Sequence, residues 1–179
     1  MKILAALFCF AGAAAAQTAP ANPLVAASKT VYAVAKNDIL GSVDKIPDDL
    51  WSFKPTDAVR TVAQLFAHVA DGQYEFCGLA ADGKVVSKGV EQSQTSKAGI
   101  VAALKEAFAY CDAAYDRMTD AAAAEAVSFA GMRLTRLGAM DFNTGHTMEH
   151  YGNLVTYMRL KNIVPPSSEP RRPAAPAKK

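Results

Sequence analysis

Apolar residues recur at every third or fourth position in four separate stretches of the chain. This spacing places them on one face of an α-helix, so each stretch predicts an amphipathic helix. We therefore expect an all-α protein in which four helices bury these faces against one another as a four-helix bundle over residues 24–166. The four predicted helices cover residues 24–46, 61–80, 96–118 and 138–161.

Local signals support two of these helix ends. Thr61 and Gln64 have the spacing of a capping box at the start of the second helix. Asn162 can adopt the left-handed conformation that ends many helices, here the fourth. Between the first two helices, Trp51 and Phe53 are expected to pack against the end of the bundle.

The connections between the helices differ in length. Residues 81–96 are polar and contain glycine, and at about 3.3 Å per residue they reach about 50 Å when extended. This exceeds the length of a 20-residue helix, about 30 Å, so the second and third helices can run parallel. Residues 119–137 contain a run of alanines and Gly131, and their local structure is left open, since no convincing strand is found.

Both ends of the chain lie outside the predicted bundle. Lys2 precedes an uncharged apolar run over residues 3–16, which is short for a bilayer span and ends in an Ala-x-Ala pattern. We predict a cleaved signal peptide at residues 1–16, with an uncleaved anchor as the alternative, then a linker at 17–23. Residues 167–179 are rich in Pro, Ala and basic residues and predict a disordered tail. The expected product is an exported periplasmic or extracellular protein without a stable membrane anchor.

The composition and charge of the chain limit the kinds of molecule that it is expected to bind. The 179 residues are 51% hydrophobic and carry a formal net charge of +2, enough for one domain with a substantial core. The basic excess lies at the two ends, which leaves a mildly acidic body between residues 17 and 168. No basic stripe is available for phosphates, so nucleic acid is not expected as a partner.

The cysteines leave an alternative open. Cys9 lies in the predicted signal peptide, and Cys77 and Cys111 remain in the mature chain. In an oxidising compartment they can form one disulfide, but two separately buried thiols fit the sequence equally well. If the second and third helices are parallel, the two cysteines lie at nearly the same height, which makes the bond possible.

The chain has three histidines, and their spacing suggests a shared metal ion. His146 and His150 are four residues apart on the fourth helix, so both imidazoles project from one face, and His68 lies on the second helix. Three neutral imidazoles with an open position are the ligand set of a catalytic metal site, with Zn the usual ion and Ni or Fe alternatives. Histidines that merely satisfy hydrogen bonds are the competing interpretation.

Several motifs extend this pattern to a known family. They are Trp51-Ser-Phe-Lys-Pro55, Val59-Arg-Thr-Val-Ala-Gln-Leu-Phe-Ala-His68, Gly145-His-Thr-Met-Glu-His-Tyr-Gly152 and the segment from Tyr157 to Ser168. Over about residues 24–168 the chain resembles the DinB-like (damage-inducible) family of four-helix-bundle metalloenzymes. The resemblance implies an up-down-down-up bundle with a long crossover between the second and third helices. It also implies a divalent metal ion held by His68, His146 and His150.

The function that follows stays open between three classes. The resemblance suggests a metal-dependent transferase or hydrolase acting on an unknown small-molecule substrate; export weakens the transferase interpretation, since small thiol cosubstrates are mainly cytosolic. The alternatives are a non-catalytic metal-binding or sensing protein of the cell envelope and a structural helical bundle, which could act as a homodimer. The residues considered as general acid or base are Asp71, Tyr74, Glu149 and Tyr151.

Overall fold

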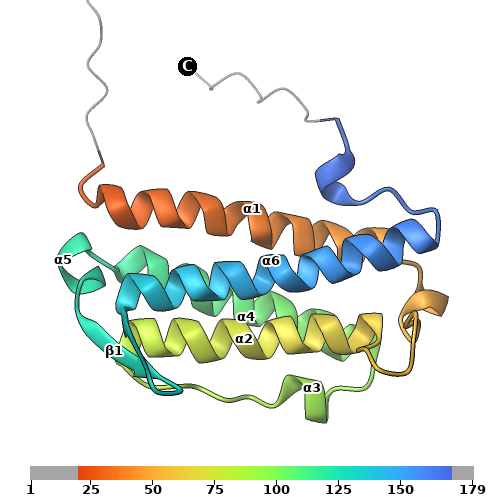
Figure 1. The fold of residues 1–179 in the computed structure, drawn as a ribbon, viewed down its shortest axis with the longest axis horizontal. Coiled ribbons are helices and arrows are strands. Elements are labelled where there is room, and N and C mark those ends of the chain that lie inside the picture. Colours follow the sequence, from red (N-terminus) through yellow and green to blue (C-terminus); the bar gives the residue numbers. More distant parts are fainter. Residues whose placement is uncertain (1–19, 171–179) are drawn as a thin grey trace, which may run out of the picture.

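Four long helices lie side by side and make up most of the protein (Figure 1). The computed structural model describes residues 20–170. The helices α1 and α6 run in one direction, and α2 and α4 run in the opposite direction. Their bounds are α1 Pro23–Lys45, α2 Val62–Asp82, α4 Lys97–Arg117 and α6 Arg136–Leu160. Each bound lies within two residues of the one predicted from the apolar periodicity.

The helix ends follow the expected chemistry. The side chains and backbones of Thr61 and Gln64 bond each other reciprocally, with N···O distances of 2.9 and 3.2 Å, as a capping box requires. After α6, Asn162 has a φ of 57°, the left-handed conformation expected at a helix end. Between α1 and α2, a 3₁₀ turn (η1, Asp48–Leu50) leads to Trp51, whose buried ring stacks on Phe66.

A β-hairpin precedes α6, where the sequence showed no convincing strand. After the short helix α5 (Asp120–Ala123), strands β1 (Ala126–Phe129) and β2 (Met132–Thr135) pair antiparallel. Ala130 and Gly131 form the turn, with φ values of 47° and 82°. A two-residue hairpin turn of this kind needs positive φ at both positions and usually has Asn or Asp at the first. Because Ala130 occupies the first turn position, the sequence lacks the Asn or Asp that would have indicated a hairpin. The expectation of no strand was therefore wrong.

The connection from α2 to α4 is partly ordered against α2. It contains a short helix, α3 (Val90–Ser93), which the polar composition of residues 81–96 did not suggest. The Asp71 carboxylate on α2 accepts hydrogen bonds from the backbone N–H groups of Val90 and Glu91, at 2.7 and 2.9 Å. These bonds hold the start of α3 beside the middle of α2, and they place Glu91 next to the bundle.

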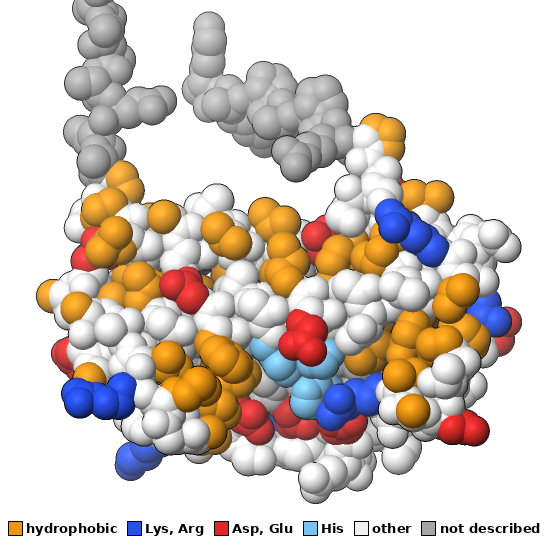
Figure 2. All heavy atoms as spheres, in the orientation of Figure 1, with side chains coloured by type: hydrophobic (Ala, Val, Ile, Leu, Met, Phe, Trp, Pro, Cys, Tyr) orange, Lys and Arg blue, Asp and Glu red, His pale blue; other side chains and the backbone are white. Residues whose placement is uncertain are grey.

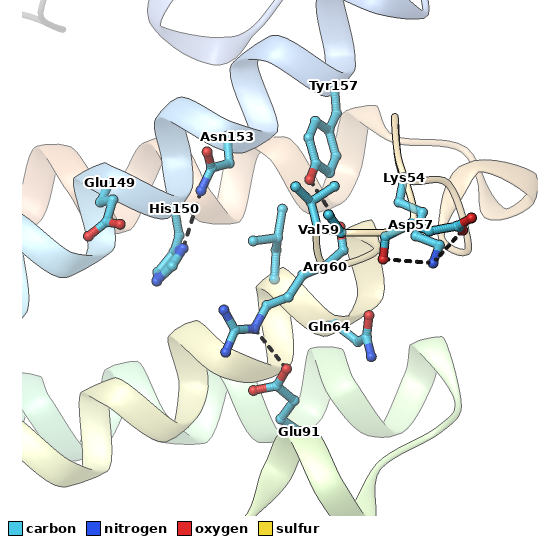
Figure 3. A pocket seen from close by; sticks show the side chains of 12 residues that line it. Lys54, Asp57, Val59, Arg60, Gln64, Glu91, Glu149, His150, Asn153 and Tyr157 are labelled. Carbon is cyan, nitrogen blue, oxygen red and sulfur yellow. Dashed lines mark hydrogen bonds and ion pairs between the residues drawn. The ribbon is translucent and has the colours of Figure 1, made fainter.

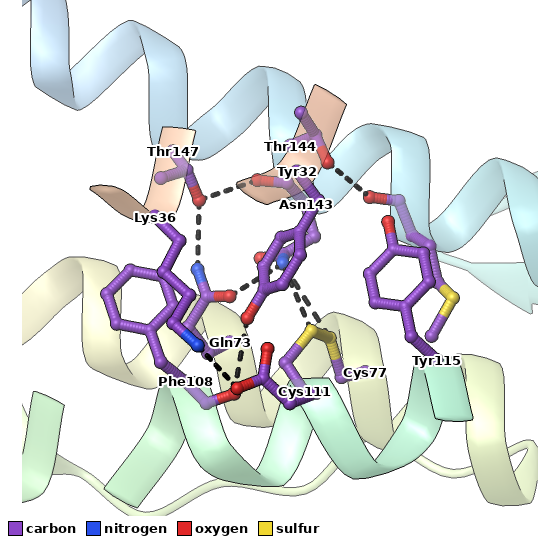
Figure 4. The surroundings of a disulfide bond; sticks show 12 residues. Tyr32, Lys36, Gln73, Cys77, Phe108, Cys111, Tyr115, Asn143, Thr144 and Thr147 are labelled. Atoms are coloured by element: carbon purple, nitrogen blue, oxygen red, sulfur yellow. Dashed lines mark hydrogen bonds and ion pairs between the residues drawn. A yellow bond between two sulfur atoms is a disulfide. The ribbon is translucent and has the colours of Figure 1, made fainter. Parts of the chain in front are cut away.

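The contact between α2 and α4 contains a disulfide bond. Cys77 and Cys111 are fully buried and bonded, with their Cα atoms 5.2 Å apart (Figure 4). The amide of Asn143 on α6 points at the two sulfur atoms and donates to the Gln73 side chain at 2.8 Å; Gln73 donates in turn to Thr147 at 2.9 Å. The structure thus answers the question that the sequence left open, and the Asn143 and Thr147 side chains of α6 find buried partners on Gln73.

The described chain continues beyond the predicted end of the bundle. Pro166–Ser168 forms a second 3₁₀ turn (η2), where the sequence suggested a disordered tail from residue 167. The Tyr151 hydroxyl donates to the Ser167 hydroxyl at 2.7 Å, and Lys45 forms an ion pair with Glu169. These contacts hold residues 167–169 against α1 and α6, within the segment where the sequence predicted disorder.

The remaining terminal predictions lie outside the described residues. These are the signal peptide at 1–16, the first three residues of the linker at 17–23, and the last nine residues of the tail. Among residues 20–170, no helix is both long and apolar enough to cross a bilayer.

Candidate metal centre

The three histidines meet at the contact between α2 and α6. His68 extends from α2, and His146 and His150 extend from successive turns of α6. Nε2 of His146 lies 3.1 Å from Nε2 of both His68 and His150, and the potential ligand atoms of the group all lie within 4.8 Å of one another. Figure 2 shows the histidine side chains reaching the surface in the middle of one face, with acidic and basic side chains around them.

The arrangement of these nitrogens fits a metal ion better than a hydrogen-bond network. His68 Nδ1 lies 3.0 Å from the Glu91 carboxylate, which only accepts hydrogen bonds, so in the neutral imidazole Nδ1 is assigned the proton and Nε2 the lone pair. Three Nε2 atoms that face one another cannot all be satisfied by the single N–H of each neutral imidazole. A tetrahedral ion with bonds of 2.0–2.1 Å places its ligand nitrogens about 3.3 Å apart, close to the spacing here. The three histidines could therefore hold one metal ion.

His146 is positioned by close packing. A Cβ atom on Gly72 would lie 2.7 Å from Cε1 and 2.8 Å from Nδ1 of the His146 ring, so only glycine lets the ring approach α2 this closely. On its other side the ring contacts Phe76, with ring centroids 5.6 Å apart. The buried Nδ1 of His146 has no hydrogen-bond partner among the described residues. Packing, rather than a polar partner, orients this imidazole.

Burial also keeps two of the imidazoles neutral. It lowers the pKa of His146 to about 3, and the nearby His150, His68 and Arg60 add to this shift. The pKa of His150 is lowered by burial first and by the charges of His68 and Arg60 after that. Neutral imidazoles keep the lone pairs that a metal ion needs, so the site is ready for a cation at neutral pH.

The histidines open onto two hollows. The larger is a cleft of about 590 Å³ with His150 in its wall, lined also by Arg60, Glu91 and Glu149 (Figure 3). The smaller, of about 180 Å³, is lined by His68 and His146 among others. The larger cleft has the volume of a small-molecule site, typically about 300–1,000 Å³, and a ligand in it would lie beside His150.

Comparison with known proteins identifies the family. The family model of the DinB superfamily matches residues 32–154, more than half of the chain. The chain belongs to the DinB superfamily. Among solved structures, a DinB-like protein from Bacillus subtilis has the same fold, with a TM-score of 0.66 at 18% sequence identity. The match covers 84% of this chain and 100% of that one. No match is found among curated proteins.

Of the four residues considered as acid or base in this DinB-superfamily chain, only Glu149 lines the larger cleft. Asp71 lines the smaller hollow but is engaged at the start of α3. Tyr74 packs on Tyr110 of α4, and its pKa is raised to about 12, chiefly by burial. Tyr151 bonds Ser167 on another side of α6. Glu149 and Asp71 thus line the hollows beside the histidines, and Tyr74 and Tyr151 line neither of them.

Two residues of the site carried no role in the sequence analysis. Glu91 bonds His68 through one carboxylate oxygen and Arg60 through the other, at 3.0 and 2.8 Å. Glu91 follows His68 by 23 residues and lies in a polar connection, so no spacing rule links the two. Arg60 lies within a quoted family motif, but nothing local shows that its side chain reaches the histidines. Asp71 holds the start of α3 beside α2, and this places Glu91 where it bonds both His68 and Arg60.

Proposed function

We propose that His68, His146 and His150 bind one divalent metal ion and that the protein is a metal-dependent enzyme, a transferase or a hydrolase, acting on a small molecule. The observation that carries this proposal is the convergence of three Nε2 atoms at the wall of a cleft. Three protein ligands leave a position for water or substrate, which distinguishes catalytic sites from closed structural ones.

Zinc is the first candidate for the ion. Three imidazole ligands at tetrahedral spacing suit zinc, and nickel and iron also accept imidazole. Membership in the superfamily is compatible with each of them. A divalent ion held this way supplies Lewis-acid chemistry, by which a water or thiol becomes a better nucleophile.

The residues around the histidines have separable tasks in this proposal. Glu91 accepts the Nδ1 proton of His68, which fixes the tautomer and aims Nε2 at the ion. Gly72 and Phe76 hold the ring of His146 between them. Glu149 lies in the cleft wall beside His150 and is the residue that we assign to proton transfer.

The disulfide supports a location outside the cytoplasm. Disulfides persist in oxidising compartments and are rare in the cytosol, where thiols are kept reduced. We therefore propose that the chain is exported and that its signal peptide is cleaved near residues 16 and 17. Intact-mass measurement of secreted protein should show loss of the first 16 residues, and retention of Lys2 would contradict cleavage. Homodimerisation and the lack of nucleic-acid partners stay predictions.

Metal binding can be tested with a matched pair of variants on α6. The wild-type protein, purified without an affinity tag, should take up one equivalent of Zn²⁺ or Co²⁺. His150→Ala should lose stoichiometric binding, and Met148→Ala, which truncates an exposed side chain two residues away, should keep it. Circular dichroism should show the same helix content in both variants. Equal binding by wild type and His150→Ala would overturn the metal site.

Catalysis needs a separate measurement. The zinc-loaded protein should be tested for hydrolysis of activated esters and for transfer of a thiol to an activated aryl halide. Activity in either assay should depend on zinc and fall in Glu149→Gln, while that variant binds the metal normally. Stoichiometric zinc without activity in either assay would favour the non-catalytic metal-binding alternative.

A further inference from the structure

The larger cleft contains an arginine whose hydrogen-bonding capacity is only partly used. Arg60 donates from Nε to the Glu91 carboxylate at 2.8 Å, and 41% of its side-chain surface is exposed. Among residues 20–170, neither terminal nitrogen of this guanidinium has a hydrogen-bond partner. Figure 3 shows these nitrogens on the side of the cleft that faces His150. The bond from Nε to Glu91 therefore positions the guanidinium, and its two terminal nitrogens are available to bind a ligand.

The backbone beneath this side chain is held firmly. The Arg60 carbonyl accepts a hydrogen bond from the Tyr157 hydroxyl at 3.0 Å. The next residue, Thr61, begins α2 through its capping box, and the Val62 N–H bonds the Phe53 carbonyl at 3.0 Å. With the backbone held at these points and Nε held by Glu91, Arg60 loses little further freedom when it binds a ligand.

The charged side chains that line the cleft indicate which charge a bound ligand would carry. Lys54 and Arg60 face Asp57, Glu91 and Glu149, so these side chains leave one excess negative charge. Imidazole ligands are neutral, and a divalent ion would therefore change this balance to one excess positive charge. Lys54 forms an ion pair with Asp57 at 3.0 Å, which leaves Arg60 as the cation with open donors. A ligand with a single negative charge balances the loaded cleft.

We propose that the substrate is a small monocarboxylate, bound by the terminal nitrogens of Arg60 while its other end reaches the metal site. A guanidinium presents two parallel N–H groups that match the two oxygens of a carboxylate. A dianionic phosphate would overcompensate the single excess charge. Val59 and Leu65 add apolar surface to the same cleft, which suits a short hydrocarbon linker between the two ends. This inference rests on the proposed metal site.

Cobalt-loaded protein offers a direct test. A neutral imidazole that ligates Co²⁺ changes the visible absorption of the ion, so binding can be followed without a known substrate. The probes are 3-(imidazol-4-yl)propionate, which carries one negative charge, and its neutral amide, which differ only in the carboxylate. Wild-type protein should bind the carboxylate about tenfold more tightly than the amide, as expected for a partly exposed charge-assisted pair.

Variants assign this preference to Arg60. Arg60→Gln should take up Co²⁺ like wild type but lose the roughly tenfold preference for the carboxylate probe. Arg60→Lys keeps the positive charge but lacks the two parallel N–H groups, so it should lose most of this preference. Lys54→Gln, in the same cleft, should keep the preference. Equal binding of the two probes by wild type, or an unchanged preference in Arg60→Gln, would overturn the inference. Failure of wild type to bind Co²⁺ would instead overturn the proposed metal site.

Discussion

The helix α2 makes two contacts of opposite character. Toward α4 it contributes Cys77, which is buried and covalently bonded to Cys111. Toward α6 it contributes His68, which is partly exposed and whose Nε2 faces the Nε2 atoms of two other imidazoles. The first contact is complete within the protein, and in our proposal a divalent cation completes the second. Stability and function are thus assigned to different sides of one helix.

A layer of buried polar side chains separates these two contacts. Gln73, Asn143 and Thr147 are fully buried and bond one another between the sulfur atoms and the histidines. Buried polar groups with partners specify one register between helices, because any shift leaves them unpaired. The layer fixes how α6 lies on α2, and with it the approach of His146 and His150 to His68.

Removal of the disulfide should have the largest effect, and it should fall on stability alone. Replacing Cys77 and Cys111 by alanine removes a cross-link that spans 34 residues. The chain-entropy model predicts a loss of about 3–4 kcal/mol in the free energy of unfolding. Urea denaturation of the wild type and the double variant measures this loss. Zinc titration of the folded double variant should give unchanged affinity; a large loss of affinity would show that the two contacts are coupled.

Filling the space at Gly72 should have the next largest effect, and it should fall on metal binding. In Gly72→Ala the new Cβ would collide with the His146 ring, since the atoms would lie 2.7 Å apart. Overpacking of about 1–3 kcal/mol should lower zinc affinity by about 10- to 100-fold. Gly145→Ala on α6 is the control, because a Cβ there meets nothing within 4 Å. Equal zinc affinities in competition titrations would refute the close approach of His146.

Glu91→Gln tests how much the connection between α2 and α4 contributes to the site. The variant keeps a hydrogen-bond acceptor near His68 but removes the carboxylate, so zinc affinity should fall by about tenfold. Glu149→Gln, which alters an exposed carboxylate beside His150, should change zinc affinity much less. Isothermal titration of both variants makes the comparison, and the reverse order of the two effects would contradict our assignment.

A separate effect should appear in the pH dependence of the metal-free protein. Burial lowers the pKa of His146 to about 3 from its ordinary 6.5, so between these values the unfolded chain binds a proton that the folded chain excludes. The free energy of unfolding should therefore fall as pH decreases below 6.5. His146→Gln removes this group, and its stability should depend less steeply on pH over the same range. Identical slopes in denaturant unfolding series would argue against the burial of a neutral imidazole.

The apolar periodicity predicted the four long helices closely because each one buries a single face, which the sequence displays directly. The apolar periodicity did not predict the hairpin. Its first turn position is occupied by Ala130, where asparagine or aspartate would have indicated a turn. Ser167 lies just beyond the predicted end of the bundle, and it bonds Tyr151, a residue sixteen positions away, a contact that no local pattern displays.

By itself, the sequence determined which residues lie on one helix face, and hence that His146 and His150 point the same way. Only the tertiary structure decided that His68 joins them, that Gly72 admits the ring of His146, and that Glu91 and Arg60 reach the site from segments outside α6. Periodicity along a helix is a local property and is visible in one chain. The distance between two helices depends on every side chain packed between them, so a site built across such a contact exists only once the chain has folded.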